Sequence, residues 1–172
     1  LLEITIELLP SFIPAIIDLA HMHLLPQQEN DDVLLWNPNI KEAERLLKSV
    51  LKINPDFGYS WYLLGELYLK LGAGEKAEKH FLKAYKFEET KGRSAYQLGL
   101  KNLKRKSYQD AKSYLLESVK LNFEKSACLY QISKILEIEK TDYKNILEVL
   151  QEASGSAQAE ERNEYDQANN YS

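Results

Sequence analysis

Apolar residues recur along most of the chain at the spacing of amphipathic helices. Positions i, i+3, i+4 and i+7 are apolar in one short segment after another, and residues at these positions share one face of an α-helix. Turn signals such as Gly72-Ala73-Gly74 separate the segments. The pattern predicts helices over residues 1–9, 11–25, 40–53, 57–71, 75–87, 92–105, 108–121, 126–139 and 142–153.

The apolar pattern also repeats after 34 residues. Residues at this interval are Leu64-Gly65 and Leu98-Gly99, Ala77 and Ala111, and the row Tyr62, Tyr96 and Tyr130. A glycine inside a helix costs about 1 kcal/mol relative to alanine. We therefore expect Gly65 and Gly99 to lie where two helices approach too closely for a side chain, with Ala77 and Ala111 facing them.

The most regular unit resembles a known repeat. Residues 57–87 carry its signature at Trp61, Leu64, Gly65, Tyr68, Ala77, Phe81 and Ala84. These residues resemble the tetratricopeptide repeat, an antiparallel helix pair of 34 residues. The unit departs from the signature at Glu89, where proline is usual, and the next unit departs at Ala95 and Asn102. The resemblance implies an all-α fold, an α-solenoid of stacked helix pairs that forms a right-handed superhelix.

The same pattern divides the chain into repeat units. We expect a repeat array over residues 1–153 and a polar C-terminal tail over 154–172, which lacks the apolar residues of a core. An insert over about 26–39 contains Val33, Leu34, Leu35 and Trp36, which either fold back onto neighbouring helices or protrude as a docking element. The units expected are a partial unit at 1–9, then about 11–53, 57–87, 92–121 and 126–153.

The resemblance also implies a partner-binding groove, lined by set positions of the first helix of each pair. Those positions hold Tyr59, Tyr62, Glu66 and Lys70, then Arg93, Tyr96, Leu100 and Lys104, then Tyr130 and Lys134. Such a groove suits a protein or peptide segment with apolar and acidic residues, because Tyr and Arg are favoured at interfaces. Tyr62, Tyr96 and Tyr130 are equally well explained as scaffold residues. Tyr62 and Glu66 do not match the Lys and Asn pattern of repeats that bind chaperone C-termini.

Charge leaves further alternatives open. The net charge is −4, but residues 1–40 contain six acids and no Lys or Arg, whereas residues 91–125 carry +6. The basic stretch 101–106 lies at an expected helix C-terminus, where positive charge complements the helix dipole. It is also a candidate site for an acidic protein segment or, less favoured, for RNA. Leu1, Ile4, Leu8 and Leu9 form an apolar face that favours a second alternative, a structural arm or oligomerisation module of an enzyme complex, with self-association through the N-terminal helix.

No grouping of residues points to catalysis, a metal or a cofactor. His21 and His23 lie two residues apart and so do not face each other on a helix, and Cys128 has no local His partner. The sequence therefore predicts a non-enzymatic scaffold that binds proteins within a larger assembly. A single cysteine predicts a cytoplasmic setting, and the apolar run 12–20 is too short to span a membrane. Since the sequence starts at Leu1, we expect it to be an excerpt.

Overall fold

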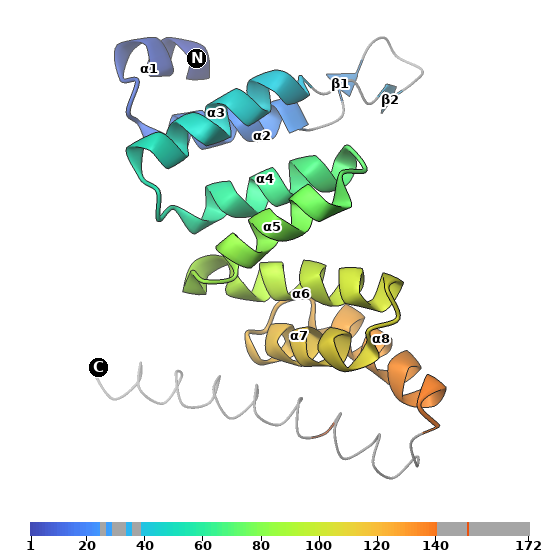
Figure 1. The fold of residues 1–172 in the computed structure, drawn as a ribbon. Helices are drawn as coiled ribbons and strands as arrows, with labels where there is room; N and C mark the ends of the chain where they lie inside the picture. The colour runs from blue at the N-terminus through green and yellow to red at the C-terminus, as the bar shows by residue number, and fades with distance from the viewer. Residues whose placement is uncertain (25–26, 29–33, 36–38, 141–150, 152–172) are drawn as a thin grey trace, which may run out of the picture. The chain divides into compact units, whose positions relative to one another are not determined.

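The structure is a computed structural model that describes residues 1–24, 27–28, 34–35, 39–140 and 151. Helices dominate this part of the chain, so the predicted all-α class is confirmed. The helices, drawn in Figure 1, are α1 (Leu2–Leu8), α2 (Ile13–Leu24), α3 (Ile40–Ile53), α4 (Gly58–Lys70), α5 (Gly74–Ala84), α6 (Glu88–Lys104), α7 (Tyr108–Lys120) and α8 (Lys125–Ile138). Two short strands, β1 (Gln27–Gln28) and β2 (Leu34–Leu35), pair antiparallel inside the expected insert.

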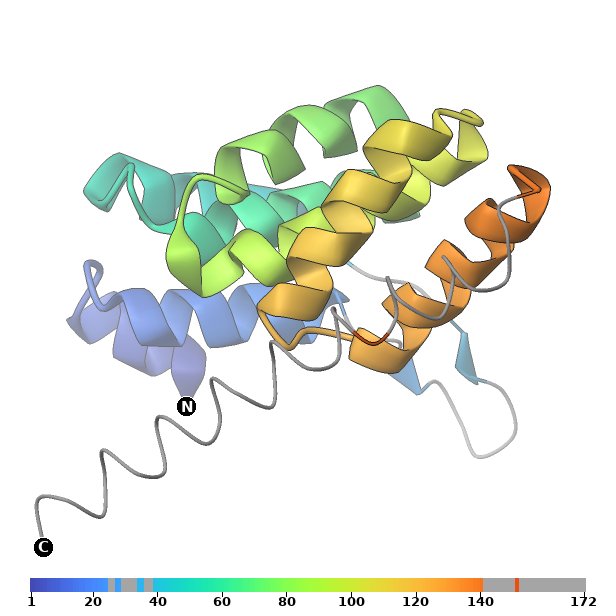
Figure 2. The same ribbon diagram turned by 90° about the horizontal axis from the view of Figure 1, so that it is seen from below.

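The chain divides into two compact units, Leu1–Phe87 and Glu88–Ser172. In the first unit α2 packs along α3 and α4 packs along α5, while α3 also contacts α4. In the second unit α6 packs along α7, and α7 packs along α8, as Figure 2 shows for the yellow and orange helices. Each unit is thus built from helices that pack along their neighbours in sequence, as the sequence pattern predicts.

In the first unit α3 and α4 are joined by buried apolar residues and by a polar link. Leu47 of α3, Leu64 and Leu67 of α4 are almost fully buried. Tyr68 of α4 donates a hydrogen bond from its hydroxyl to Oε1 of Glu44 on α3, over 2.6 Å. Burial and this carboxylate raise the pKa of Tyr68 to about 12. At neutral pH the Tyr68 hydroxyl therefore keeps its proton, and the hydrogen bond links α4 to α3.

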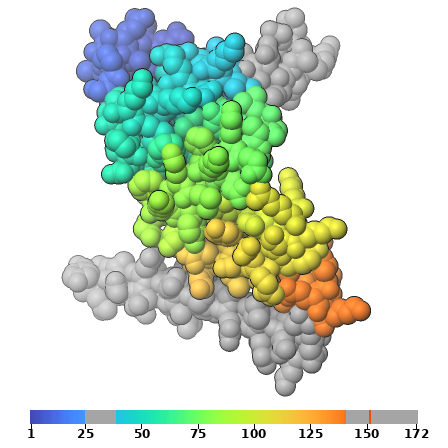
Figure 3. Space-filling view, viewed as in Figure 1, coloured from blue at the N-terminus to red at the C-terminus, as the bar shows by residue number. Residues whose placement is uncertain are grey.

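The short helix α1 lies against α2 and carries no buried residue. In the space-filling view its atoms, in dark blue, lie beside those of the next helices of the first unit (Figure 3). Ile4, Leu8 and Leu9 are exposed along it. Self-association through this face stays a prediction.

The second unit has its own apolar cluster. Residues of α7 and α8 meet in it, and Tyr96 and Leu103 of α6 pack against its edge. Its fully buried members are Ala111, Leu115, Val119, Cys128, Ile132, Ile135 and Leu136. The cluster fixes α8 against α7, which positions the outward face of α8.

Gly65 and Gly99 lie at close helix contacts, as expected. A Cβ atom added to Gly65 would lie 2.5 Å from Cε1 of Phe81 on α5. One added to Gly99 would lie 2.8 Å from Cγ of Leu115 on α7. The expected alanines, Ala77 and Ala111, are buried nearby, but the side chain that fills each notch is the larger residue one turn further on.

The turns after α4, α6 and α8 share a left-handed residue at the 34-residue interval. Gly72 has φ +71°, Lys106 has φ +61° and Lys140 has φ +51°. The backbone amide of Ala73 donates a hydrogen bond to the carbonyl oxygen of Tyr68, and the amide of Ser107 donates to the carbonyl oxygen of Asn102. This pattern closes a helix with one left-handed residue, for which glycine is the favoured type. Sequence reasoning found the turn at Gly72 but not its two lysine counterparts.

Helix α6 begins earlier than expected, at Glu88 instead of residue 92. The signature proline that would end the preceding segment is replaced by Glu89. Glu88 and Glu89 occupy the first turn of α6, where carboxylates interact favourably with the helix dipole. The helix therefore extends backwards by one turn.

Several expectations fall on residues outside the described part of the chain. These are the helix over 142–153, the tail over 154–172, and the role of Val33 and Trp36 in the insert. They stay predictions.

We expect Gly65→Ala to lower the free energy of unfolding of the first unit by about 1 to 2 kcal/mol. The overpacking against buried Phe81, about 1 to 3 kcal/mol, exceeds the helix propensity that alanine adds. Urea unfolding followed by circular dichroism measures the loss. The double variant Gly65→Ala/Phe81→Leu should lose less than the sum of the two single changes, and strict additivity would contradict the contact.

Lys106→Gly should raise the free energy of unfolding by about 0.5 to 1 kcal/mol. The change removes the strain of a residue that carries a side chain in the left-handed conformation. The greater freedom of glycine in the unfolded chain offsets part of this gain. Gly72→Lys is the matched reverse change, since nothing lies within 4 Å of the added Cβ, and it should be destabilising. Thermal unfolding of both variants tests this; shifts of the same sign would contradict it.

Candidate partner-binding surfaces

Four of the expected groove residues lie along α4 in the first unit. Tyr59 and Tyr62 stack with ring centroids 6.1 Å apart and an angle of 16° between their planes. Tyr62 also packs against Phe81, at 5.8 Å, and is only 8% exposed. Most of the Tyr62 ring is therefore buried in the α4–α5 contact, and little of its surface is available to a partner.

Glu66 follows Tyr62 by one turn and accepts a hydrogen bond from it. Burial raises the pKa of Glu66 above its ordinary value, and the bond from Tyr62 and the charge of Lys70 oppose this rise. Lys70 itself donates from Nζ to the carbonyl oxygen of Leu24 at the end of α2, over 3.2 Å. The structure thus brings Tyr59, Tyr62, Glu66 and Lys70 together on one side of α4 and links them to α2.

The second unit arranges its groove residues around a ring that sequence reasoning missed. Phe123, in the turn between α7 and α8, meets Tyr96 edge-on with centroids 6.1 Å apart. The guanidinium carbon of Arg93 lies 5.4 Å from the centre of the same ring. Leu100 and Lys104 continue this side of α6, Leu100 half-buried and Lys104 exposed. The 34-residue pattern gave no signal for Phe123, because it lies in a turn that varies between units.

On α8 the structure places Tyr130 and Lys134 in contact. Tyr130 is 56% exposed, far more than Tyr62. Nζ of Lys134 lies 4.3 Å from the centre of the Tyr130 ring. A cation held against an aromatic face gains about 0.5 to 1 kcal/mol at an exposed site. The two residues, one turn apart on α8, form an outward pair of ring and charge.

The basic stretch 101–106 lies at the C-terminal end of α6, where the sequence places it. Two other cations of the basic region are held by acids of neighbouring elements. Lys91 pairs with Glu117 on α7 at 3.2 Å, and Lys112 pairs with Glu139 at 2.9 Å. These two lysines therefore serve contacts between elements of the unit.

Other candidates fit packing roles. Cys128 is fully buried with its Sγ 3.7 Å from the carbonyl oxygen of Phe123, and burial raises the pKa of its thiol. Within the described ranges no three His, Cys, Asp or Glu residues gather to hold a metal ion. Among the helices that the structure describes, none has the length and apolar character that crossing a membrane requires.

Residues 39–98 match the family model of the tetratricopeptide repeat. The match begins at the N-cap of α3, includes α4 and α5, and ends within α6. It contains the groove positions from Tyr59 to Tyr96, while Leu100, Lys104, Tyr130 and Lys134 lie beyond it. A comparison with curated proteins found no match to this chain.

Glu66→Gln should make the protein more stable at pH 7. The pKa of Glu66 in the folded state is above its ordinary value of 4.5. At pH values between the unfolded-state pKa and the folded-state pKa, the folded protein therefore binds more protons than the unfolded protein. Stability therefore falls as pH rises through that window, and the ionised carboxylate carries the full penalty above it. Glutamine keeps an acceptor for Tyr62 and has no such penalty.

Urea unfolding from pH 4 to pH 7 measures this effect. The advantage of Glu66→Gln over the unmodified protein should be smallest at pH 4 and grow as pH rises. Glu78→Gln, on α5 of the same unit, is the control for a change of net charge. An advantage that shrinks with rising pH would contradict the burial of Glu66.

Proposed function

Because residues 39–98 match the family model of the tetratricopeptide repeat, we propose that this chain is a protein–protein interaction module that serves as a scaffold in a larger assembly. Repeats of this family generally mediate protein–protein interaction. The role proposed is binding rather than catalysis. The partner proposed is a peptide or helical segment that carries apolar and acidic residues.

The ring-and-cation pairs of the second unit carry this proposal. Arg93 lies on Phe123 at 5.4 Å and Lys134 lies on Tyr130 at 4.3 Å. Each pair offers an apolar surface and a positive charge within one side-chain length. An acidic residue next to an apolar one in the partner would meet both features at once. Tyrosine and arginine are also the residue types most often found at energetic centres of interfaces.

The rigidity of the frame supports the same conclusion. Tyr130 and Lys134 stand on a helix whose inner face, Ile132 and Ile135, is fully buried. Side chains on a packed helix lose little conformational freedom when a partner binds. The basic end of α6 adds positive charge to this unit, which would speed the approach of an acidic segment at low salt.

The double variant Tyr130→Ala/Lys134→Glu should lose partner binding. Because the variant loses a tyrosine contact and reverses a charge, the amount of partner captured should fall at least tenfold. Affinity capture from cell extract with quantitative mass spectrometry, supported by crosslinking on the full chain, measures it. Circular dichroism should show unchanged helicity, since both side chains are exposed.

The matched control is Leu82→Ala/Lys79→Glu. It removes an exposed apolar side chain and reverses one lysine on α5, a second helix of a pair. This control should keep the partners that the first variant loses. If both variants lose the same partners equally, or the first keeps them, the groove assignment is wrong.

A further inference from the structure

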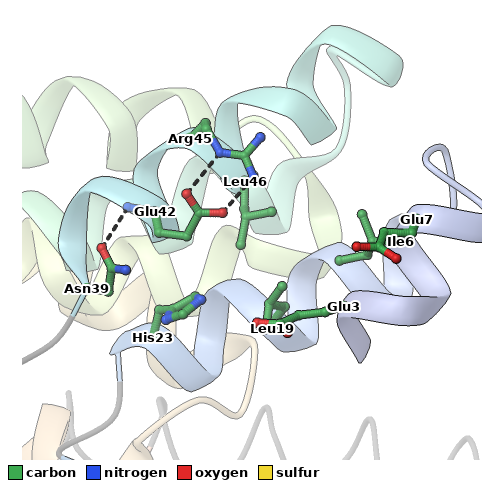
Figure 4. A pocket seen from close by; sticks show the side chains of 9 residues that line it. All are labelled: Glu3, Ile6, Glu7, Leu19, His23, Asn39, Glu42, Arg45 and Leu46. Atoms are coloured by element: carbon green, nitrogen blue, oxygen red, sulfur yellow. Dashed lines mark hydrogen bonds and ion pairs between the residues drawn. The ribbon is translucent and has the colours of Figure 1, made fainter. Parts of the chain in front are cut away.

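A cleft of about 430 Å³ lies in the first unit between α1, α2 and the start of α3. Figure 4 shows the side chains that line it, which come from all three helices. Its volume falls within the range of ligand-binding clefts, about 300 to 1,000 Å³. None of the groove positions implied by the repeat pattern contributes to it, so it is a separate feature of the chain.

The floor of the cleft is apolar. Ile6 of α1, Leu19 of α2 and Leu46 of α3 line it, and Leu19 and Leu46 are buried by their helix contacts. Ile6 is only partly buried, so it gives most of the hydrocarbon surface that the aliphatic part of a ligand can cover, and the buried Leu19 and Leu46 add little area. The packing of α2 on α3 holds these two leucines in place.

The rim of the cleft is acidic. Glu3 and Glu7 line it from α1, one helical turn apart, and both are exposed. Carboxylates at i and i+4 share a face of the helix and repel each other. A cation placed between them would remove that repulsion.

The arginine in the cleft is already engaged. Arg45 donates from Nε and Nη2 to the two carboxylate oxygens of Glu42, at 2.9 and 2.5 Å. This fork holds the pKa of Glu42 below its ordinary value. Arg45 and Glu42 thus cancel locally, and Glu3 and Glu7 set the net negative charge. No Lys or Arg occurs anywhere in residues 1–40 to reduce it.

We propose that this cleft binds a partner protein segment through a lysine or arginine side chain. The aliphatic stem lies mainly on Ile6, next to the small exposed parts of Leu19 and Leu46, and the charged head lies between Glu3 and Glu7. Lys and Arg are the side chains that combine a hydrocarbon stem with a cationic head. The second unit, with its exposed cations, suits acidic segments, so the two surfaces select partner chemistry of opposite sign.

The test uses the full chain labelled with ¹⁵N and an acetylated peptide of alternating leucine and lysine. Amide signals of Ile6, Leu19 and Leu46 should shift on titration, and binding should weaken from 50 to 500 mM salt. The same peptide with glutamate in place of lysine should shift none of them. Shifts with the glutamate peptide would mean an anion site at Arg45 and would overturn the proposal.

Two variants of equal charge separate the cleft from general attraction. The double variant Glu3→Gln/Glu7→Gln should lower the affinity for the lysine peptide about fivefold, which is the effect expected from the loss of two exposed ion pairs. Asp18→Asn/Asp56→Asn removes the same charge from exposed positions outside the lining and should leave the affinity unchanged. Equal weakening by both variants would overturn the proposal.

A second copy of this chain is the remaining occupant to distinguish. If it fills the cleft, the signals of Ile6 and Leu46 will move with protein concentration in the absence of peptide. That result would overturn the proposal in favour of self-association. Signals that stay fixed from 20 to about 500 μM protein, together with the peptide response, support it.

Discussion

Close approach of two helices at a missing side chain is the constraint on which each unit depends. Gly65 receives the ring of Phe81, and Gly99 receives the branched end of Leu115. A glycine weakens its own helix by about 1 kcal/mol. Filling the notch with a large apolar side chain buries enough surface to exceed that cost, since a buried Phe or Leu contributes about 1.5 to 3 kcal/mol. The helix pair is therefore stabilised by tertiary packing against its local propensity.

The same close packing governs the neighbouring positions. Ser60 and Ser94 are 34 residues apart and fully buried, and in the described part of the chain their hydroxyls have no hydrogen-bond partner. An unsatisfied buried hydroxyl is unfavourable, so the small size of serine outweighs its polarity there. Lys106 and Lys140 show a similar compromise, because both adopt the left-handed conformation that Gly72 adopts without strain. Geometry recurs in this chain more faithfully than residue type.

That difference explains how far the sequence could predict the structure. The 34-residue interval and the apolar spacing were enough for the helices α3 to α8 and for the notch at Gly65. The start of α6 was missed because the family pattern led one to expect a proline where Glu89 stands. The roles of the tyrosines were not predictable from the sequence. Tyr62 and Tyr130 occupy the same position of the repeat, but the exposure of each ring depends on its neighbours, such as Phe81 beside Tyr62. Phe123 and the cleft arise from contacts between elements and left no periodic signal.

Charge is distributed along this chain in a way that the two surfaces explain. The helix frame needs no particular charge at exposed positions, so the absence of Lys and Arg from residues 1–40 and the excess of +6 over residues 91–125 are not consequences of the fold. Part of the positive charge in the second unit serves internal pairs, those of Lys91 with Glu117 and Lys112 with Glu139. Two exposed cations of this unit, Arg93 and Lys134, lie on aromatic rings. In the first unit Arg45, which lines the cleft, is held by Glu42. The surface proposed for binding thus carries cations in the second unit and an excess of carboxylates in the first, an arrangement that favours partners of opposite charge and repels partners of like charge.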